Sequence, residues 1–246
     1  MKKFIIDCFA ENATKYSSDH AVVVVDVIRA TTTATTAVSI GRALYPAKGT
    51  DDAIVLGKTL RDPLYVGELG GHVPYGFDLT NSPVEVMSLA TIPSGFFTAP
   101  HRPLILVSSS GMPALMNATE SEAAYIACLR NYKAVANYIA KRHKNIAIVG
   151  AGTRGEFRRE DQIGCSWVAE VLMKDHGFEP ENEKSRELVE RWSGVDLDCI
   201  REGNSASYLR RSGQAHDLEF VLHHVDDLTV VPHLKDGKLH DVQEST

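Results

Sequence analysis

The chain has 246 residues, of which 43% are hydrophobic and 24% are charged. This composition excludes a disordered chain, and the length suits one large domain or two small ones. With 26 Lys and Arg against 32 Asp and Glu, the formal net charge is −6. Non-specific binding to nucleic acid needs a strongly basic surface, so we expect no nucleic-acid partner. A small anionic ligand in a locally positive pocket stays compatible with this charge.

Cysteine usage and hydropathy indicate the compartment. The four cysteines, at positions 8, 128, 165 and 199, form no Cys-x-x-Cys pair, which is typical of reduced thiols in the cytosol. No apolar run approaches 18 residues, and residues 4–10 are too short and interrupted for a signal peptide. We therefore expect a cytoplasmic protein without a membrane partner, and a homodimer stays open.

Short β-branched runs alternate with longer helical patterns along the chain. Residues 21–28, AVVVVDVI, are nearly continuous valine, which is typical of a strand buried on both faces of a parallel sheet. The other predicted strands are 64–66, 104–107, 123–127 and 146–149, with late strands at 220–222 and 229–231 before a polar tail from residue 235.

Helical spacing of apolar residues lies between these strands. The predicted helices are 29–43, 131–144 and 161–174, followed by a charge-rich, helical elaboration at about 179–211. Another helix is predicted to begin at Ser82, because Ser82, Pro83 and Glu85 form a capping box with proline in the first helical position. Strands separated by helices form βαβ units. We therefore predict an α/β fold, a three-layer α/β/α sandwich on a mostly parallel or mixed sheet, in a single domain over residues 1–246.

Four loops after predicted strands are rich in glycine, hydroxyl groups and charge. They are residues 26–33, 67–83, 108–113 and 150–161. In parallel α/β sheets, ligands bind beyond the carboxyl ends of the strands, so we expect the functional site where these loops meet.

The first loop combines Asp26 at a buried strand end with Arg29 and the threonines 31–33 at the start of a helix. A helix N-terminus, hydroxyl groups and a guanidinium group together suit phosphate or sulfonate oxygens. The alternative is an ion pair between Asp26 and Arg29, with Thr31 as an ordinary helix cap.

The second and third loops add acidic and hydroxyl groups. Glu68 follows a strand directly, and together with Asp26 and Asp161 it offers the oxygen ligands that Mg²⁺ prefers. Asp78 and Asn81 are equally explained as turn residues. The serines 108–110 with Gly111 either cradle an anion or cap a helix, and no G-x-S-x-G elbow indicates a nucleophile.

The fourth loop contains a literal G-x-G-x-x-G at 150–155, a pattern found in dinucleotide-binding folds. The charged residues 156–161 that follow lack the apolar face of the helix that should begin there. We therefore expect this loop to present Arg154, Glu160 and Asp161 to the site.

Taken in order, these stretches resemble the 2-phosphosulfolactate phosphatase family. The matching stretches are 26–33 (DVIRATTT), 67–71 (GELGG), 76–83 (GFDLTNSP), 108–115 (SSSGMPAL), 131–136 (NYKAVA), 150–161 (GAGTRGEFRRED) and, more weakly, 216–232 (HDLEF…DDLTVVP). The resemblance implies a three-layer α/β fold and a Mg²⁺-dependent phosphatase of coenzyme M biosynthesis. Such an enzyme converts 2-phospho-3-sulfolactate and water to 3-sulfolactate and phosphate.

Four positions depart from the family pattern. Leu69 stands where the family has arginine, Ser110 and Met112 replace an asparagine and a threonine, and Gly150 replaces a cysteine. The loss of an arginine and an amide removes anion contacts, so the substrate is less constrained than the phosphatase class.

With this reaction in view, each site residue receives an expected role. Asp26, Glu68 and Asp161 would hold Mg²⁺, and Glu160 would act as general base. The residues expected to bind the small anionic phosphorylated substrate are Arg29, Thr31, Thr32, Thr33, Asn81, Ser110, Gly111 and Arg154. A covalent aspartyl-phosphate on Asp26 is the alternative to direct attack by water. A nicotinamide-dinucleotide oxidoreductase that uses 150–155 and a non-catalytic anion-binding relative are the other function classes.

Overall fold

The computed structural model describes residues 1–16, 19–91, 102–152 and 155–242. Its strands are β1 (Lys3–Cys8), β2 (Ala21–Val25), β3 (Leu44–Ala47), β4 (Leu64–Gly67), β5 (Leu104–Val107), β6 (Ala123–Ala127), β7 (Asn145–Gly150), β8 (Glu179–Pro180), β9 (Pro232–Lys235) and β10 (Lys238–Asp241). Its helices are α1 (Ala30–Ser39), α2 (Thr50–Gly57), α3 (Pro83–Thr91), α4 (Gly111–Asn117), α5 (Tyr132–Ile139), α6 (Arg159–His176), α7 (Glu183–Trp192), α8 (Asn204–Arg211) and α9 (Ala215–His223), with 3-10 helices η1 (Ala10–Tyr16) and η2 (Leu197–Glu202).

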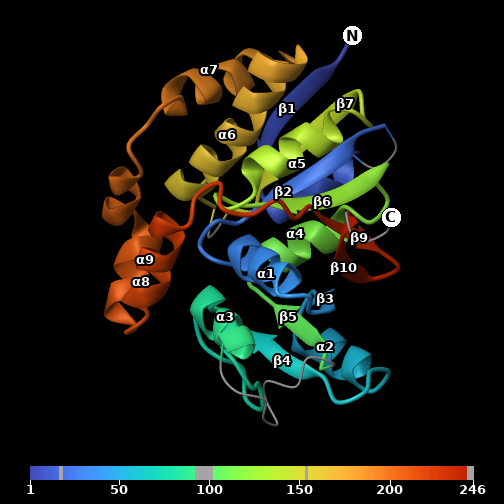
Figure 1. Ribbon diagram of the computed structural model, residues 1–246, viewed down its shortest axis with the longest axis vertical. Helices are drawn as coiled ribbons and strands as arrows, with labels where there is room; N and C mark the ends of the chain where they lie inside the picture. Colours follow the sequence, from blue (N-terminus) through green and yellow to red (C-terminus); the bar gives the residue numbers. More distant parts are fainter. Residues whose placement is uncertain (17–18, 92–101, 153–154, 243–246) are drawn as a thin grey trace.

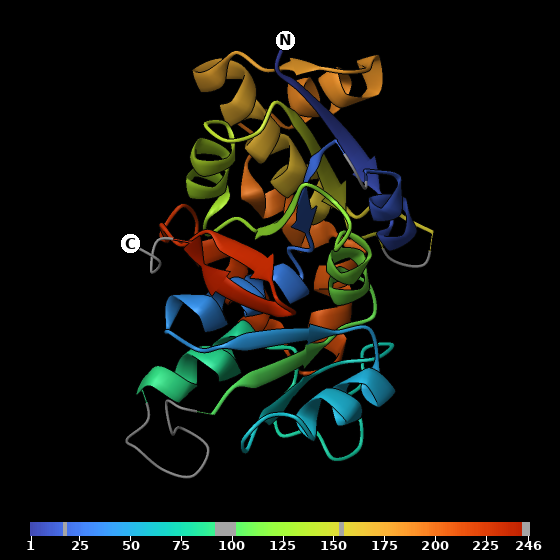
Figure 2. The same cartoon turned by 90° about the vertical axis from the view of Figure 1, so that its right-hand side faces the viewer.

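The strands form one mixed sheet in the order β4-β5-β3-β10-β9-β6-β2-β7-β1-β8. The strands β4, β5 and β3 are parallel to one another, and so are β6, β2, β7, β1 and β8. The hairpin β9-β10 joins these two parallel parts through antiparallel pairs with β6 and β3. Figure 2 shows the hairpin, in red, between the two parts. The predicted mostly parallel or mixed sheet is therefore confirmed.

The valine run of β2 explains the layered architecture. Val23 and Val25 pack in one apolar core with residues of α5 and α6, whereas Val22 and Val24 pack in another with residues of α1, α3 and α4. Alternate side chains of a strand point to opposite faces, so a strand with helices on both sides needs apolar residues throughout. The result is the predicted three-layer α/β/α sandwich. In Figure 1, α6 and α7 lie at one end of the molecule with β1 and β7, and α2 and α3 lie at the other end with β4 and β5.

Several predicted elements have the expected positions. The strands predicted at 64–66, 104–107, 123–127 and 146–149 are β4, β5, β6 and β7. The first predicted strand ends at Val25 rather than at residue 28, because the chain turns at Asp26 into α1. The predicted N-cap is confirmed, since the Glu85 N–H donates to the Ser82 hydroxyl at 3.1 Å.

The late strands are wrong. Residues 220–222 lie in α9, where the apolar residues 218, 221 and 222 have helical spacing and Leu218 and Val221 are buried. Residues 229–231 precede β9, which begins at Pro232. The predicted polar tail contains β10, because Asp236 and Gly237 both have positive φ and turn the chain into a hairpin.

Within the described ranges, no helix is long and apolar enough to cross a membrane.

Candidate active site

Asp26 lies at the carboxyl end of β2 and has 9% of its surface exposed. The turn after the strand fixes its main chain, since the Thr31 hydroxyl accepts from the Asp26 N–H and donates to the Asp26 carbonyl, both at 2.9 Å. The Ala30 N–H, at the start of α1, donates to the Asp26 carboxylate at 3.3 Å. The positive end of the α1 dipole therefore lies beside this carboxylate.

Helix α4 closes against Asp26 at Gly111. A Cβ atom at this position would lie 2.6 Å from Asp26 Oδ2 and 2.7 Å from the Cβ of Ala30, so a larger residue does not fit. Gly111 follows β5, which belongs to the other parallel part of the sheet. The loops 26–33 and 108–113, which the sequence predicted to share a site, therefore meet.

The first turn of α6 brings two further carboxylates to this place. Glu160 and Asp161 have 2% and 3% of their surfaces exposed. The Val27 N–H donates to the Asp161 carboxylate at 2.8 Å, which ties the start of α6 to the loop after β2. The Glu160 carboxylate is hydrogen-bonded to the side chain of Ser205, near the start of α8.

These buried carboxylates shift one another's ionisation. Burial, together with the charges of Glu68 and Glu160, raises the pKa of Asp26 to about 7. Burial and the charges of Asp26 and Glu160 raise the pKa of Asp161 well above its ordinary value, and burial raises that of Glu160. Such upward shifts mean that nearby positive charge does not compensate these groups. Perturbed carboxylates gathered at strand ends are typical of a functional site.

Glu68 connects the loops that follow β4 and β5. Its carboxylate accepts the N–H groups of Ser109, at 2.9 Å, and Gly71, at 2.7 Å, and the Ser109 hydroxyl at 3.1 Å. Asp78, in the same segment, accepts the N–H of Tyr65 at 2.8 Å and so serves the turn. Of these two acidic residues, Glu68 is the one whose charge reaches Asp26.

The three threonines of the first loop differ in what their hydroxyl groups contact. Thr31 bonds the main chain of Asp26, and Thr32 donates to the carbonyl of Val27 at 2.8 Å. Both hydroxyl groups therefore hold the turn before α1, and Thr31 is not the expected helix cap, because no side-chain hydrogen bond caps the start of α1. Thr33 is fully buried, and its hydroxyl has no partner among the described residues. The Asn81 side chain is also buried, with its oxygen unpartnered in the described part of the chain.

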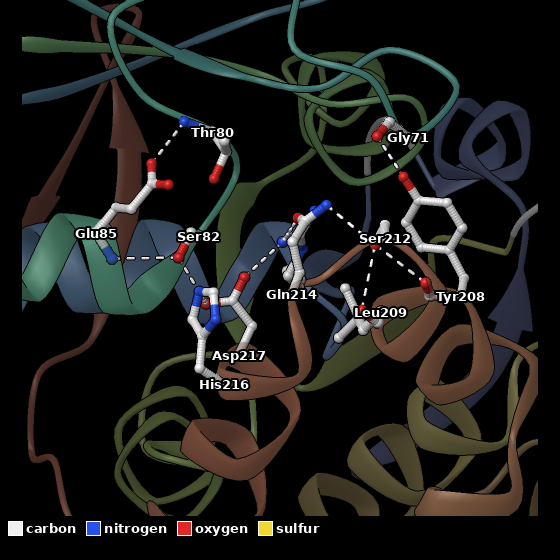
Figure 3. A network of polar contacts seen from close by, with 11 residues as sticks. Gly71, Thr80, Ser82, Glu85, Tyr208, Leu209, Ser212, Gln214, His216 and Asp217 are labelled. Carbon is white, nitrogen blue, oxygen red and sulfur yellow. Dashed lines mark hydrogen bonds and ion pairs between the residues drawn. The ribbon is translucent and has the colours of Figure 1, made fainter.

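Arg29 is buried and pairs with Asp217 of α9 rather than with Asp26, so the alternative of an Asp26–Arg29 ion pair is wrong. Its Nη1 lies 2.5 Å from Asp217 Oδ2 and also donates to the Gln214 side chain. The other Asp217 oxygen accepts the Ser82 hydroxyl at 2.5 Å. Figure 3 shows Asp217 and Gln214 close together, with Ser82 and the start of α3 beside them. The charge of Arg29 also reaches Asp26, whose pKa it lowers in part.

Sequence reasoning did not identify Asp217, Gln214 or Tyr208. The Tyr208 hydroxyl donates to the carbonyl of Gly71, in the loop of Glu68 (Figure 3). These residues belong to α8 and α9 or the turn between them. The only signal that included any of them was the weaker match at 216–232, which contains Asp217.

Ser110 lines a hollow of about 300 Å³ together with Phe9, Glu11 and Gly152, and none of the four carboxylates lines it. The hollow lies at the ends of β1, β5 and β7. Arg154, predicted to bind substrate, lies outside the described residues.

No helix follows the glycine-rich motif directly, because α6 begins at Arg159, four residues after Gly155. The Phe157 ring occupies the space beside Gly150, where a Cβ atom would meet it at 2.3 Å. A Cβ atom at Gly152 would likewise lie 2.6 Å from the Phe9 ring and 3.0 Å from the Cys8 sulfur, so these side chains fill the space beside Gly152. The geometry therefore gives no support to dinucleotide binding.

The four carboxylates are the residues of the site with the chemistry to hold a metal ion. Within the described residues, no three His, Cys, Asp or Glu side chains are arranged as a metal-binding group. Mg²⁺, however, commonly binds through one or two carboxylates and completes its shell with water and phosphate oxygens. Uncompensated carboxylate oxygens of Asp26 and Asp161 fit that chemistry.

An α/β sandwich with buried carboxylates and an anchored arginine at its loop ends has the features of a ligand-binding α/β protein. The comparisons give the family. A model of the 2-phosphosulpholactate phosphatase family matches residues 8–237. A probable 2-phosphosulfolactate phosphatase of Carboxydothermus hydrogenoformans is 30% identical over 94% of each chain. Proteins of the same name are 32% identical over 91% of each chain in Caldanaerobacter subterraneus and 33% identical over about 80% in Deinococcus radiodurans.

The chain therefore belongs to the 2-phosphosulfolactate phosphatase family. This membership makes it an enzyme, a phosphoric monoester hydrolase.

Proposed function

We propose that the protein hydrolyses 2-phospho-3-sulfolactate, or a closely related small phosphorylated acid, to 3-sulfolactate and phosphate with the help of Mg²⁺. The observation that carries the proposal is the group of buried carboxylates around Asp26, whose charges raise one another's pKa. An acidic centre of this kind binds a phosphorylated anion only when positive charge is brought to it. Membership of the family supports the substrate class.

The metal would be held by Asp26 and Asp161, with Glu68 on the adjoining loop. When bound, Mg²⁺ supplies positive charge for the phosphate oxygens and for the attacking water. Asp26 and Asp161 are joined through the turn after β2, because Asp161 accepts the Val27 N–H. Asp161 is thereby fixed relative to Asp26 before any ligand arrives.

The chain's own groups would bind and orient the phosphate. Arg29 contributes a guanidinium group, and the buried Thr33 hydroxyl, without a partner among the described residues, is a free donor. Donors that are fixed before the reaction stabilise the charge of the phosphoryl group in the transition state. Glu160 would take the proton of the attacking water, because burial raises its pKa and makes its carboxylate a stronger base.

The departures from the family pattern bear on the rest of the substrate. Met112 is fully buried in the apolar core and Gly150 is covered by Phe157, so these two positions serve packing. Leu69 is 38% exposed on the loop of Glu68, and Ser110 lines the hollow. Leu69 and Ser110 are therefore the departures that would change how the sulfonate or carboxylate is bound.

The test is phosphate release from 2-phosphosulfolactate and from phospholactate, each with Mg²⁺ and with EDTA. We expect release from 2-phosphosulfolactate that EDTA abolishes and Mg²⁺ restores. Asp26→Asn should lower kcat by at least about 100-fold, whereas the matched change Asp52→Asn, at an exposed residue of α2, should leave it unchanged. Turnover that is indifferent to EDTA would refute the role of Mg²⁺, and unchanged turnover in the Asp26 variant would remove Asp26 from the site.

Borohydride reduction during turnover separates direct attack by water from an aspartyl-phosphate on Asp26, because borohydride reduces an acyl phosphate to an alcohol. Direct attack leaves Asp26 unchanged. A covalent intermediate would give homoserine at position 26, and peptide mass spectrometry detects that change.

A further inference from the structure

Asp217 occupies an unusual place for an acidic residue, because its side chain is fully buried and lies far from its contacts in sequence. It lies in the first turn of α9 and is paired with Arg29, 188 residues earlier in the chain. Its second oxygen accepts the hydroxyl of Ser82, 135 residues earlier. Burying a charged pair costs desolvation energy that its attraction often only balances, so such a pair is weak evidence for a purely stabilising role.

The contacts of Asp217 join the two loops that carry the site. Arg29 belongs to the loop after β2, which holds Asp26, and Ser82 ends the loop after β4, which holds Glu68. The Ser82 hydroxyl also accepts the Glu85 N–H at 3.1 Å, so the same atom caps α3 and contacts Asp217. The side chain of Asp217 therefore fixes both loops against α9.

The way in which Arg29 is held leaves part of it free. Both of its side-chain hydrogen bonds among the described residues, to Asp217 and to Gln214, use Nη1. No acceptor for Nε or Nη2 is found in the described part of the chain. Gln214 is itself held by Ser212, whose hydroxyl accepts from the Gln214 amide at 3.1 Å (Figure 3).

The surroundings of Arg29 are strongly acidic. Its charge lowers the pKa of Asp26, and the negative charges of Glu68 and Glu160 raise the pKa of the same carboxyl group. Without a fixed partner, a flexible guanidinium group would pair with the nearest carboxylate of the site. The pair with Asp217 prevents this and keeps one edge of the planar group for another anion.

We propose that Asp217 is a positioning residue, which holds Arg29 by Nη1 so that Nε and Nη2 bind the phosphate of the substrate. The proposal rests on the proposed role of Arg29 in phosphate binding. Asp217 does not touch the substrate and acts only through Arg29. Helix α9, near the end of the chain, is thereby part of the machinery of a site whose other groups lie in the first two thirds.

The test is a double-mutant cycle of Arg29→Ala and Asp217→Asn, read by kcat and KM for phosphate release and by calorimetric binding of inorganic phosphate. We expect Asp217→Asn to lower kcat/KM by about 10- to 100-fold. In the Arg29→Ala background the same change should have no further effect, because the group through which Asp217 acts is gone. Losses that multiply in the double variant would overturn the proposal.

Chemical rescue gives a second readout that a structural role would not change. Guanidinium ion at millimolar concentration should restore part of the activity of Arg29→Ala, because Asp217 and Gln214 still form its binding site. It should restore none in the double variant. Equal rescue in both would show that Asp217 does not hold the guanidinium group.

A milder variant covers the case in which Asp217→Asn does not fold. Ser82→Ala removes one donor to Asp217 and should lower kcat/KM several-fold, again only when Arg29 is present. Ser88→Ala is the control, because its hydroxyl lies within α3, the helix that Ser82 caps, and among the described residues it bonds the Glu85 carbonyl alone. Equal effects of the two serine changes would overturn the proposal.

The two readouts distinguish this inference from the proposed function. A wild-type chain that releases no phosphate from either ester contradicts the function, while a non-additive loss of inorganic-phosphate binding still supports the role of Asp217. An active wild type whose kinetics and phosphate binding are unchanged by Asp217→Asn contradicts the inference alone.

Discussion

Replacing Asp26 by Asn separates what this carboxylate costs the fold from what it contributes to the reaction. Burial, followed by the charges of Glu68 and Glu160, raises the pKa of Asp26 from 3.8 to about 7. A carboxyl group with a higher pKa in the folded chain binds more protons when folded, so the free energy of unfolding falls as pH rises through this interval. At about 1.4 kcal/mol for each pH unit, ionised Asp26 costs the fold about 4 kcal/mol above pH ~7.

Asparagine has nearly the same shape as Asp26 and does not ionise, and its amide oxygen can still accept the Ala30 N–H. In EDTA at pH ~8 we therefore expect Asp26→Asn to melt about 10 °C above the wild type. This advantage should shrink as pH falls and vanish below pH ~4, where the wild-type carboxyl group is protonated in both states. The stabler variant should nevertheless be almost inactive.

The assay is thermal unfolding across this pH range, with and without Mg²⁺, together with phosphate release. Mg²⁺ should narrow the difference at pH ~8 by stabilising the wild type more than the variant. The control Asp52→Asn, which removes an exposed carboxylate, should change neither melting nor its pH dependence. A variant that is less stable than the wild type at every pH would refute the electrostatic reasoning.

Three further predictions follow from single contacts. Gly111→Ala should lower both kcat and the free energy of unfolding, the latter by about 1–3 kcal/mol, because its Cβ would lie 2.6 Å from Asp26 Oδ2. A variant with the wild-type midpoint of urea unfolding and the wild-type kcat would contradict this packing. Leu69→Arg should lower KM for 2-phosphosulfolactate by about tenfold and change KM for phospholactate less, which steady-state kinetics can compare. The Cys8 thiol should resist iodoacetamide at pH ~8, because burial and the charge of Asp161 raise its pKa to about 12; rapid labelling by mass spectrometry would be the opposite result.

The sheet and its loop ends could be predicted because their signals are local. A run of valines that ends in an acidic residue indicates a buried strand with a carboxylate at its end in one stretch of chain. Ser82 likewise marks the start of α3 through its spacing to Glu85. In the structure, however, the Glu85 carboxylate accepts the N–H of Thr80 rather than that of Ser82.

The hairpin β9-β10 has a local sequence signal for its turn, although the polar composition of the segment favours a tail. Residues 236 and 237 are Asp-Gly, a pair that favours the positive φ angles of a tight hairpin turn. Half of the hairpin's other residues are lysine or histidine, a composition that favours the predicted polar tail. Leu239 shows why the segment is a strand, because its side chain is fully buried in the apolar core between the two parallel parts.

The partner of Arg29 could not be predicted in this way. Arginine beside a strand-end aspartate suggests a local ion pair, and Asp26 is only three residues away. The structure instead pairs Arg29 with Asp217, through a contact that depends on how α9 packs against α3. No periodicity or spacing in the sequence encodes a contact between residues so far apart, and only the assembled fold shows it.

The arrangement around Arg29 explains how an acidic chain can serve a strongly anionic substrate. If Arg29 paired with Asp26, the site would lose an arginine anchor and, at the same time, part of the negative charge proposed to hold the metal. The pair with Asp217 keeps the cation and the carboxylates of the site apart although all of them are buried. Ionised Asp26 and Asp161 then disfavour the empty site, and the proposed cation with its phosphate ester would relieve that cost. The fold thus gives up stability in the free enzyme, and that free energy becomes available to ligand binding.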